Sequence, residues 1–312
     1  MLNYNLGYAC INTELSSRKV KVSTNRTMRR KTFDEKGLDY VSEIILQNVT
    51  DLLTILEWNA ENDIHFFRMS SEMFPWASEY ALEDLKDFDK IEEALFKAGL
   101  FAEEHDIRLT THPGPFNKLC SPNEQVVQNT IRDLEIHGKM MDLLCQPRSP
   151  WAKINIHVGG AYNDKPMALG NFCRNFARLS EAVRSRLTVE NDDKESLYST
   201  KELYDGVFKV IGIPIVHDYH HHTMCTGGLT QQEAVELALT TWADVVPVVH
   251  YSQSRAVEHN DPKIKPQAHS DSYWTPIDTY GHRMDIMLEC KHKELGLFKM
   301  RELMSPHCIA AK

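Results

Sequence analysis

The sequence of 312 residues lacks the features of a membrane, secreted or disordered protein. No run of 18 apolar residues occurs, and residues 1–5 have neither the basic start nor the apolar stretch of a secretory signal. The seven cysteines are odd in number and form no Cys-x-x-Cys pair, which favours free thiols over disulfides or a zinc ribbon. Hydrophobic and charged contents of 42% and 25% are ordinary for globular proteins. We expect a cytoplasmic protein of bacterial, viral or archaeal type.

Positive charge is also scarce. The chain has 35 basic and 44 acidic residues, and its net charge of −9 argues against a nucleic-acid partner because phosphate binding depends on Lys and Arg. One segment departs from this balance. Residues 18–31 contain no acidic residue and carry seven basic ones: Arg18, Lys19, Lys21, Arg26, Arg29, Arg30 and Lys31. This segment is either a solvated loop or a surface for phosphates.

Short apolar runs rich in β-branched residues alternate with longer amphipathic stretches, a pattern that predicts parallel strands joined by helices. The expected strands are 5–10, 65–69, 108–111, 153–158, 187–190, 214–217, 245–250 and 285–289. The expected helices lie near 39–62, 88–105, 122–144, 170–185, 200–210, 230–242 and 291–303. Ser121 is expected to cap the third helix, and Thr230 with Glu233 to form a capping box on the sixth.

Eight strands predict an α/β fold of the (β/α)8 TIM-barrel class, with its active site at the carboxyl ends of the strands. No linker of biased composition divides the chain. We therefore expect one catalytic domain over residues 1–304, followed by a short tail at 305–312.

The expected strand ends carry imidazoles and carboxylates from the third strand onward. They include His112, His157, Glu190, Asp218, His221, His250 and Glu289, and His269 lies in the loop before the last strand. One such residue alone is more often structural than a ligand. Several buried together need compensating cations or partners, and mixed His and carboxylate ligands suit Zn, Mn and related divalent ions. The sequence therefore predicts a multinuclear metal site.

Several motifs in order resemble the UV damage endonuclease family, over residues 4 to 303. These are Gly7-Tyr8-Ala9-Cys10-Ile11-Asn12, Phe67-Arg68-Met69-Ser70-Ser71, His112-Pro113-Gly114, Glu190-Asn191-Asp192, Asp218-Tyr219-His220-His221-His222 and Asp285-Ile286-Met287-Leu288-Glu289. The chain is similar more distantly to endonuclease IV and to xylose-isomerase-like barrels.

The resemblance implies a metal-dependent DNA endonuclease that cuts immediately 5′ to cyclobutane pyrimidine dimers and 6–4 photoproducts. It implies three divalent ions, with Mn²⁺ as first choice and Zn²⁺, Co²⁺ or Mg²⁺ as alternatives. It also implies damaged double-stranded DNA as the partner, bound by a monomer. The implied ligands are His112, His157, Glu190, Asp218, His221, His250, His269 and Glu289, of which Glu190, Asp218, His250 and Glu289 would be catalytic. His220 and His222 flank His221, and on an extended segment they cannot share its face.

Lesion and DNA contacts are implied for Tyr8, Asn12, Pro115 and Phe116, and for Arg18, Lys19, Arg29 and Arg30 of the basic segment. Two features depart from the family. Pro115-Phe116 stands where the family has a Gln-Tyr wedge, and Val248 stands where many members carry a modified lysine.

Three alternatives stay open: a metal-dependent sugar isomerase or epimerase on the same barrel, an abasic-site endonuclease, and a damage-binding protein that does not cut. An isomerase has no need of a basic segment or an aromatic wedge.

Overall fold

The computed structural model describes residues 4–305, and the predicted tail therefore lies outside the described residues except for Ser305. Eight parallel strands follow one another in chain order around a closed barrel, which confirms the predicted TIM-barrel class. The strands are β1 (Tyr4–Ala9), β2 (Phe66–Met69), β3 (Arg108–Thr111), β4 (Ile154–Ile156), β5 (Leu187–Glu190), β6 (Ile215–Asp218), β7 (Val248–Tyr251) and β8 (Met284–Leu288).

The chain forms two compact units. The first unit is Met1–Ala9 with Val189–Lys312, and the second unit is Cys10–Thr188. In the first unit β1 pairs with β8, β6 with β7 and β7 with β8, and Asp218 lies beside His250 in register. In the second unit β2 pairs with β3 and β3 with β4.

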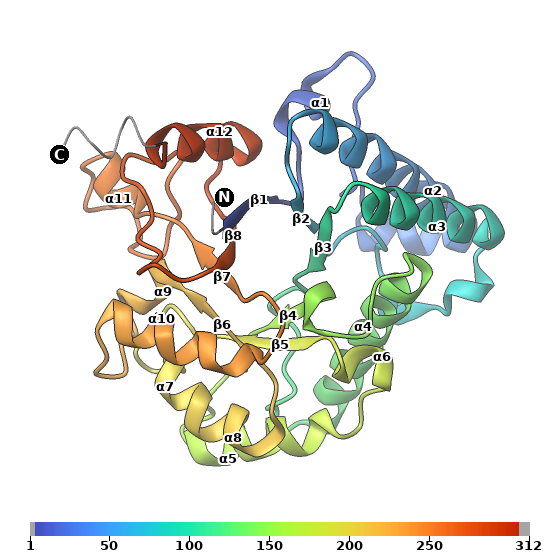
Figure 1. The fold of residues 1–312 in the computed structure, drawn as a ribbon. Coiled ribbons are helices and arrows are strands. Elements are labelled where there is room, and N and C mark those ends of the chain that lie inside the picture. Colours follow the sequence, from blue (N-terminus) through green and yellow to red (C-terminus); the bar gives the residue numbers. More distant parts are fainter. Residues whose placement is uncertain (1–3, 306–312) are drawn as a thin grey trace. The chain divides into compact units, whose positions relative to one another are not determined.

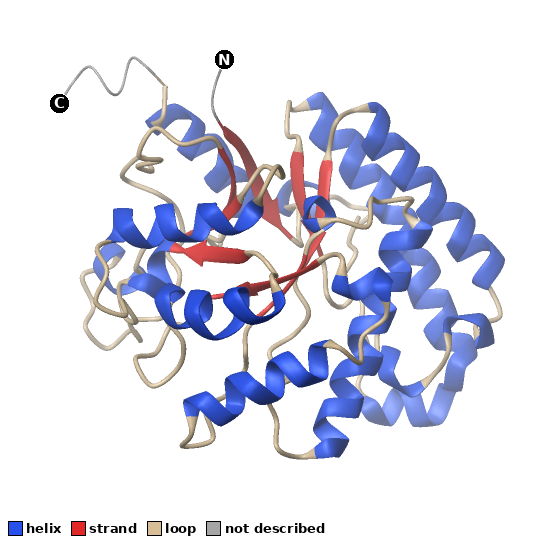
Figure 2. Cartoon of the chain, turned by 60° about the horizontal axis from the view of Figure 1, so that its bottom comes forward, coloured by secondary structure: helices blue, strands red, loops and turns tan. Residues whose placement is uncertain are grey.

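Helices make up most of the regular structure, and the strands are short (Figure 2). The second unit holds α1 (Thr13–Ser17), α2 (Arg30–Glu61), α3 (Phe88–Glu104), α4 (Glu124–Leu143), α5 (Lys165–Phe176) and α6 (Glu181–Arg184). The first unit holds α7 (Thr200–Leu203), α8 (Lys209–Ile211), α9 (Tyr219–His222), α10 (Gln231–Leu239), α11 (Arg255–Glu258) and α12 (Lys293–Leu303). The long helices α2 and α3 pack against each other (Figure 1).

The predicted helices needed four corrections. The first begins at Arg30 instead of near residue 39, although Gly37 within it has a non-helical φ of 65°. The third begins at Glu124, and Asn123 caps it instead of Ser121, because the Asn123 side chain accepts hydrogen bonds from the N–H groups of Gln125 and Val126. The predicted helix 170–185 is two helices, α5 and α6. The predicted helix 200–210 contains a π-helical turn at Tyr204–Phe208 between α7 and α8. The capping box of Thr230 and Glu233 is confirmed.

Several predicted strands were misplaced by a few residues at their ends. Strand β4 has three residues only, so His157 follows it directly. Strand β6 extends to Asp218, and β7 extends to Tyr251. Val248 is the first residue of β7, is fully buried, and lies beside Asp285 of β8. Over residues 4–305, no helix combines the length and the apolar character needed to span a bilayer.

Candidate metal centre

The carboxyl ends of the strands in the first unit place three carboxylates around one imidazole. Glu190 ends β5, Asp218 ends β6, His250 lies in β7, and Glu289 directly follows β8. Glu190, Asp218 and His250 are buried, and Glu289 is partly buried. Ionised carboxylates so close together repel one another and lose hydration, so the arrangement needs compensating positive charge.

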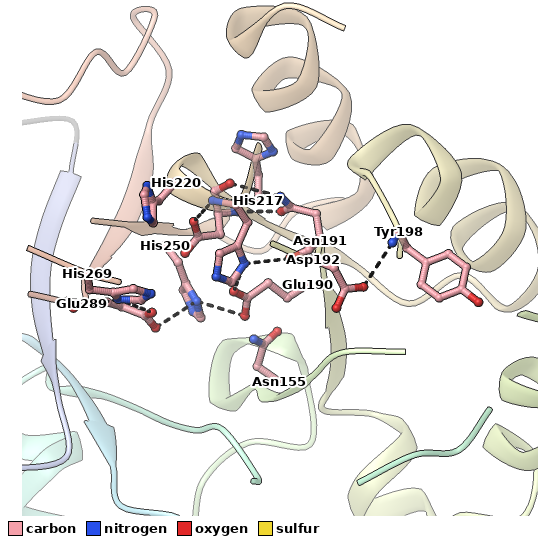
Figure 3. Close-up of polar contacts among 12 residues, drawn as sticks. Asn155, Glu190, Asn191, Asp192, Tyr198, His217, His220, His250, His269 and Glu289 are labelled. Carbon is pink, nitrogen blue, oxygen red and sulfur yellow. Dashed lines mark hydrogen bonds and ion pairs between the residues drawn. The ribbon is translucent and has the colours of Figure 1, made fainter. Parts of the chain in front are cut away.

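His250 lies between two of these carboxylates. Its Nδ1 is 3.1 Å from Oε2 of Glu190 and 3.2 Å from Oε1 of Glu289 (Figure 3). On the other side of Glu190, Oε1 is 3.3 Å from Nδ1 of His221. Four predicted ligands of the first unit are therefore brought together as the sequence indicated.

Asp218 supplies the direct sign that a cation fits here. One ligand atom from each of Asp218, His250 and Glu289 lies within 4.8 Å of the other two. Oδ1 of Asp218 accepts the N–H of His221, whereas Oδ2 is buried and has no hydrogen-bond partner among the described residues. Burial, followed by the charges of Glu190 and Glu289, raises the pKa of Asp218. A divalent ion would satisfy Oδ2 and offset these charges.

In three of the predicted imidazole ligands, Nδ1 forms a hydrogen bond with a backbone carbonyl. Nδ1 of His221 is 2.9 Å from the carbonyl of Asn191, and Nδ1 of His269 is 3.0 Å from the carbonyl of Glu289. In the second unit, Nδ1 of His112 is 3.1 Å from the carbonyl of Pro113. Fixing Nδ1 on a carbonyl selects the tautomer whose Nε2 can bind a metal, as is usual for metal-binding histidines.

The two predicted ligands of the second unit lie next to each other. His112 directly follows β3 and His157 directly follows β4. Their ring centroids are 5.5 Å apart, and the planes are tilted by 40°. The spacing lets both rings approach a shared site from adjacent strand ends.

The histidine run after β6 is helical, so the expectation of an extended segment was wrong. Asp218 caps the helical turn α9, and all three histidines are buried. Nε2 of His220 is 2.9 Å from the carbonyl of Pro266, and Nε2 of His222 is 3.2 Å from the carbonyl of Leu229. Burial lowers the pKa of both His220 and His222. These two rings thus bind backbone carbonyls, and His221 alone faces Glu190.

Asn191 is a residue of the site for which the sequence predicted no individual role. Its side chain pairs with the backbone of Asp218, and its carbonyl holds His221. The sequence feature that could have identified Asn191 is its position directly after Glu190, the last residue of β5. Tyr273 was also missed: its hydroxyl donates to the carbonyl of Tyr251 and accepts the N–H of Cys290, the neighbour of Glu289.

The candidates for lesion contact differ in exposure. Phe116 is 86% exposed, and Pro115 beside it is also exposed. Tyr8 is buried in β1. Asn12 is buried too, and its side chain caps α1 by accepting the N–H of Leu15.

Much of the basic segment is neutralised within the second unit. Arg18 pairs with Glu14 at 2.7 Å, and Arg30 pairs with Asp34 at 2.8 Å. By contrast, Lys19 and Arg29 are exposed and form no ion pair with any residue between 4 and 305. These two are the members of the predicted set whose charge is available to an external anion.

Comparison with known proteins gives a consistent result. The sequence profile of the family described as UV-endonuclease UvdE matches residues 4–311. The UV-damage endonuclease of Schizosaccharomyces pombe is 36% identical over 97% of this chain, and that of Neurospora crassa is 33% identical over 95%. The chain spans about half the length of these two relatives, 51% and 50%.

Solved structures agree with the sequence relatives. The crystal structure of SacUVDE matches with a TM-score of 0.82 and 30% identity, over 96% of this chain and 98% of that one. A D-tagatose 3-epimerase-like protein matches with a TM-score of 0.55 and 15% identity, over 80% of this chain and 90% of that one. The second likeness shows the barrel fold alone.

Proposed function

Because the chain belongs to the UV-endonuclease UvdE family, we propose that it is a metal-dependent endonuclease acting on UV-damaged DNA. Its reaction is hydrolysis of the phosphodiester immediately 5′ to a cyclobutane pyrimidine dimer or a 6–4 photoproduct. The observation that carries this proposal is the group of buried Asp218 and His250 with partly buried Glu289, in which a carboxylate oxygen of Asp218 lacks a hydrogen-bond partner among the described residues.

We propose that three divalent ions, Mn²⁺ by preference, bind at this site. When bound, such ions acidify water and neutralise charge on a phosphodiester. The protein's part is to hold the ligands: Asp218 and Glu289 as carboxylates beside His250, and Glu190 between His250 and His221. His269, held by the carbonyl of Glu289, supplies a further nitrogen.

His112 and His157 are proposed as the remaining ligands. Each follows a strand of a parallel barrel directly, and the carboxyl ends of such strands carry the catalytic groups of these folds. Nδ1 of His112 is held by a carbonyl, in the manner of a metal-binding histidine.

The proposed substrate is a damaged DNA duplex, bound by a monomer. Phe116 is an exposed aromatic ring in a turn and can enter the gap left by bases that leave the stack. Lys19 and Arg29 supply charges for the phosphate backbone. Tyr8 and Asn12 are also proposed to lie near the lesion. Both side chains are buried, so this role requires them to act from below the protein surface.

The decisive experiment uses a duplex with one defined photoproduct, beside undamaged and abasic duplexes and a ketose sugar. With Mn²⁺, we expect one cut 5′ to the photoproduct and no cut after EDTA is added. Epimerisation of the sugar without any nick would contradict the proposal, as would a preference for the abasic duplex. Binding of the photoproduct without cleavage would identify a damage-binding protein instead.

A further inference from the structure

His269 differs from the other proposed ligands because it lies far along the chain from any strand. It occupies the loop between β7, which ends at Tyr251, and β8, which begins at Met284. Its ring is partly exposed, and the carbonyl of Glu289 holds its Nδ1 (Figure 3). A ligand on a loop is precise only if the surrounding structure holds that loop in place. Groups outside the strands must therefore fix the backbone at His269.

The segment before α11 supplies part of this support. Ser254 and His269 form an antiparallel bridge, which is isolated and so constrains the backbone less than a full strand pair would. Two backbone hydrogen bonds flank the bridge: the N–H of Arg255 donates to the carbonyl of Ala268 at 2.9 Å, and the N–H of Ser270 donates to the carbonyl of Gln253 at 2.8 Å. The residues just after Ser270 need an anchor of their own.

Glu258, the last residue of α11, provides that anchor with both oxygens of its carboxylate. Oε2 accepts the N–H of Asp271 at 2.6 Å, and Oε1 accepts the N–H of Ser272 at 3.1 Å. Hydrogen bonds to an ionised acceptor are roughly twice as strong as those between neutral groups. The side chain of Glu258 is only 20% exposed, which limits competition from water. One side chain thus holds the two residues that follow Ser270 in the loop of His269.

Asp271 ties the same part of the loop to α11 through its side chain. Its Oδ2 is 2.7 Å from Nε2 of His259, and its Oδ1 is 3.3 Å from Nε of Arg255. Glu258, His259 and Asp271 together have the composition of a cation site. Their oxygens are already committed, however, to backbone N–H groups, an imidazole and a guanidinium. These contacts suit an anchor for the loop better than an additional ion.

We propose that Glu258 is a positioning residue for His269. Its carboxylate fixes the backbone of the loop, so that the imidazole keeps its place at the metal centre. The inference rests on the proposed function and adds a residue that is not itself a ligand. Groups that orient metal ligands typically contribute about ten- to a hundredfold to metal affinity.

The test is a double-mutant cycle of Glu258→Ala and His269→Ala, read by titration calorimetry of the full chain with Mn²⁺. Each single change is expected to weaken the Mn²⁺ site served by His269 by at least about tenfold. Because Glu258 acts through His269, adding Glu258→Ala to His269→Ala should cost nothing further. The control is Glu236→Ala, which removes a partly exposed carboxylate of α10 that bonds the side chains of Gln232 and His282.

Two further variants separate anchoring from other effects. Glu258→Gln keeps the size of the side chain and one acceptor oxygen, so it should lose less Mn²⁺ affinity than Glu258→Ala. His259→Ala removes an exposed imidazole from the cluster and leaves both bonds of Glu258 in place. It should therefore weaken Mn²⁺ binding by less than about threefold, as expected for an exposed pair.

Additive losses in the cycle would overturn the inference, because Glu258 would then act independently of His269. Unchanged Mn²⁺ affinity in both Glu258 variants would overturn it as well. An equal loss in His259→Ala and Glu258→Ala would overturn it by identifying the cluster as an ion site in its own right. Failure of the wild type to bind Mn²⁺ or to nick photoproducts would instead refute the proposed function.

Discussion

The side-chain amide of Asn191 forms two hydrogen bonds with the backbone of Asp218, one through its oxygen and one through its nitrogen. Oδ1 of Asn191 accepts the N–H of Asp218 at 2.7 Å, and Nδ2 donates to the carbonyl of Asp218 at 3.1 Å. The carbonyl of Asn191 also holds His221. One amide residue thus orients two of the proposed ligands without being a ligand itself.

Replacing Asn191 with Ala should therefore weaken metal binding while leaving the proposed ligands in the chain. We expect Mn²⁺ affinity to fall by about ten- to a hundredfold, as is usual when groups that orient ligands are removed. Titration calorimetry with Mn²⁺ measures this. Asn129→Ala is the control, because Asn129 lies on the exposed face of α4. Unchanged Mn²⁺ affinity in Asn191→Ala would show that the pairing is only structural.

Glu289→Gln tests the proposed role of the carboxylate beside His250. The change keeps the size of the side chain and removes one negative charge at 3.2 Å from the imidazole. We expect nicking to fall by about a thousandfold, because charge stabilisation at such a centre contributes several kcal/mol. Single-turnover cleavage checks it, with the exposed capping residue Glu233→Gln as control. Cleavage within about twofold of the wild type would remove Glu289 from the catalytic set.

Phe116→Ala should reduce recognition of the lesion without affecting folding. Because the side chain is 86% exposed, its removal should change the free energy of unfolding by less than about 0.5 kcal/mol. The affinity for a photoproduct duplex should fall by about tenfold, since stacking on bases is removed. Competition binding against undamaged duplex measures the difference. An unchanged preference of Phe116→Ala for the photoproduct duplex would contradict the proposed contact with the lesion.

The basic segment should contribute unequally to DNA binding. In Lys19→Ala and in Arg29→Ala, the slope of log K against log salt should become shallower by about 0.9 for each phosphate that is no longer neutralised. Arg18→Ala should change it less, because Glu14 already pairs with Arg18. Binding to undamaged duplex over a series of NaCl concentrations gives the slopes. Equal salt slopes for the three variants would contradict the prediction that Arg18 contributes less than Lys19 and Arg29.

Arg186→Met should destabilise the protein by about 3 kcal/mol. The guanidinium is fully buried and donates to the carbonyls of Gln146, Pro147 and Ala182, and it pairs with Asp142 at 2.8 Å. Methionine leaves these acceptors unsatisfied, so the urea concentration at the midpoint of unfolding should fall. Arg148→Met, which removes an exposed partner of the same Asp142, should have a much smaller effect. Similar midpoints for the two variants would contradict this account.

The sequence alone was enough to predict the eight strands and to place the candidate ligands at their carboxyl ends. Alternation of apolar runs and amphipathic stretches is a local signal, and in a parallel barrel it implies which residues stand at strand ends. Glu190, Asp218 and Glu289 could be chosen on that ground. The identity and number of the ions stay predictions, because ligand types suit several metals.

Other features could not be predicted from the alternation of strands and helices. His220 and His222 turn away from Glu190 because Asp218 caps a helical turn, and a run of three histidines does not reveal its own backbone conformation. Arg26 looks as basic as Lys19 in the sequence, yet the fold pairs it with Asp51 of α2 at 2.7 Å. The hydroxyl of Tyr273 reaches the carbonyl of Tyr251 because the loop before β8 packs against β7. Local chemistry therefore determined which groups the barrel presents, and tertiary packing decided which of them remain available to a metal or to DNA.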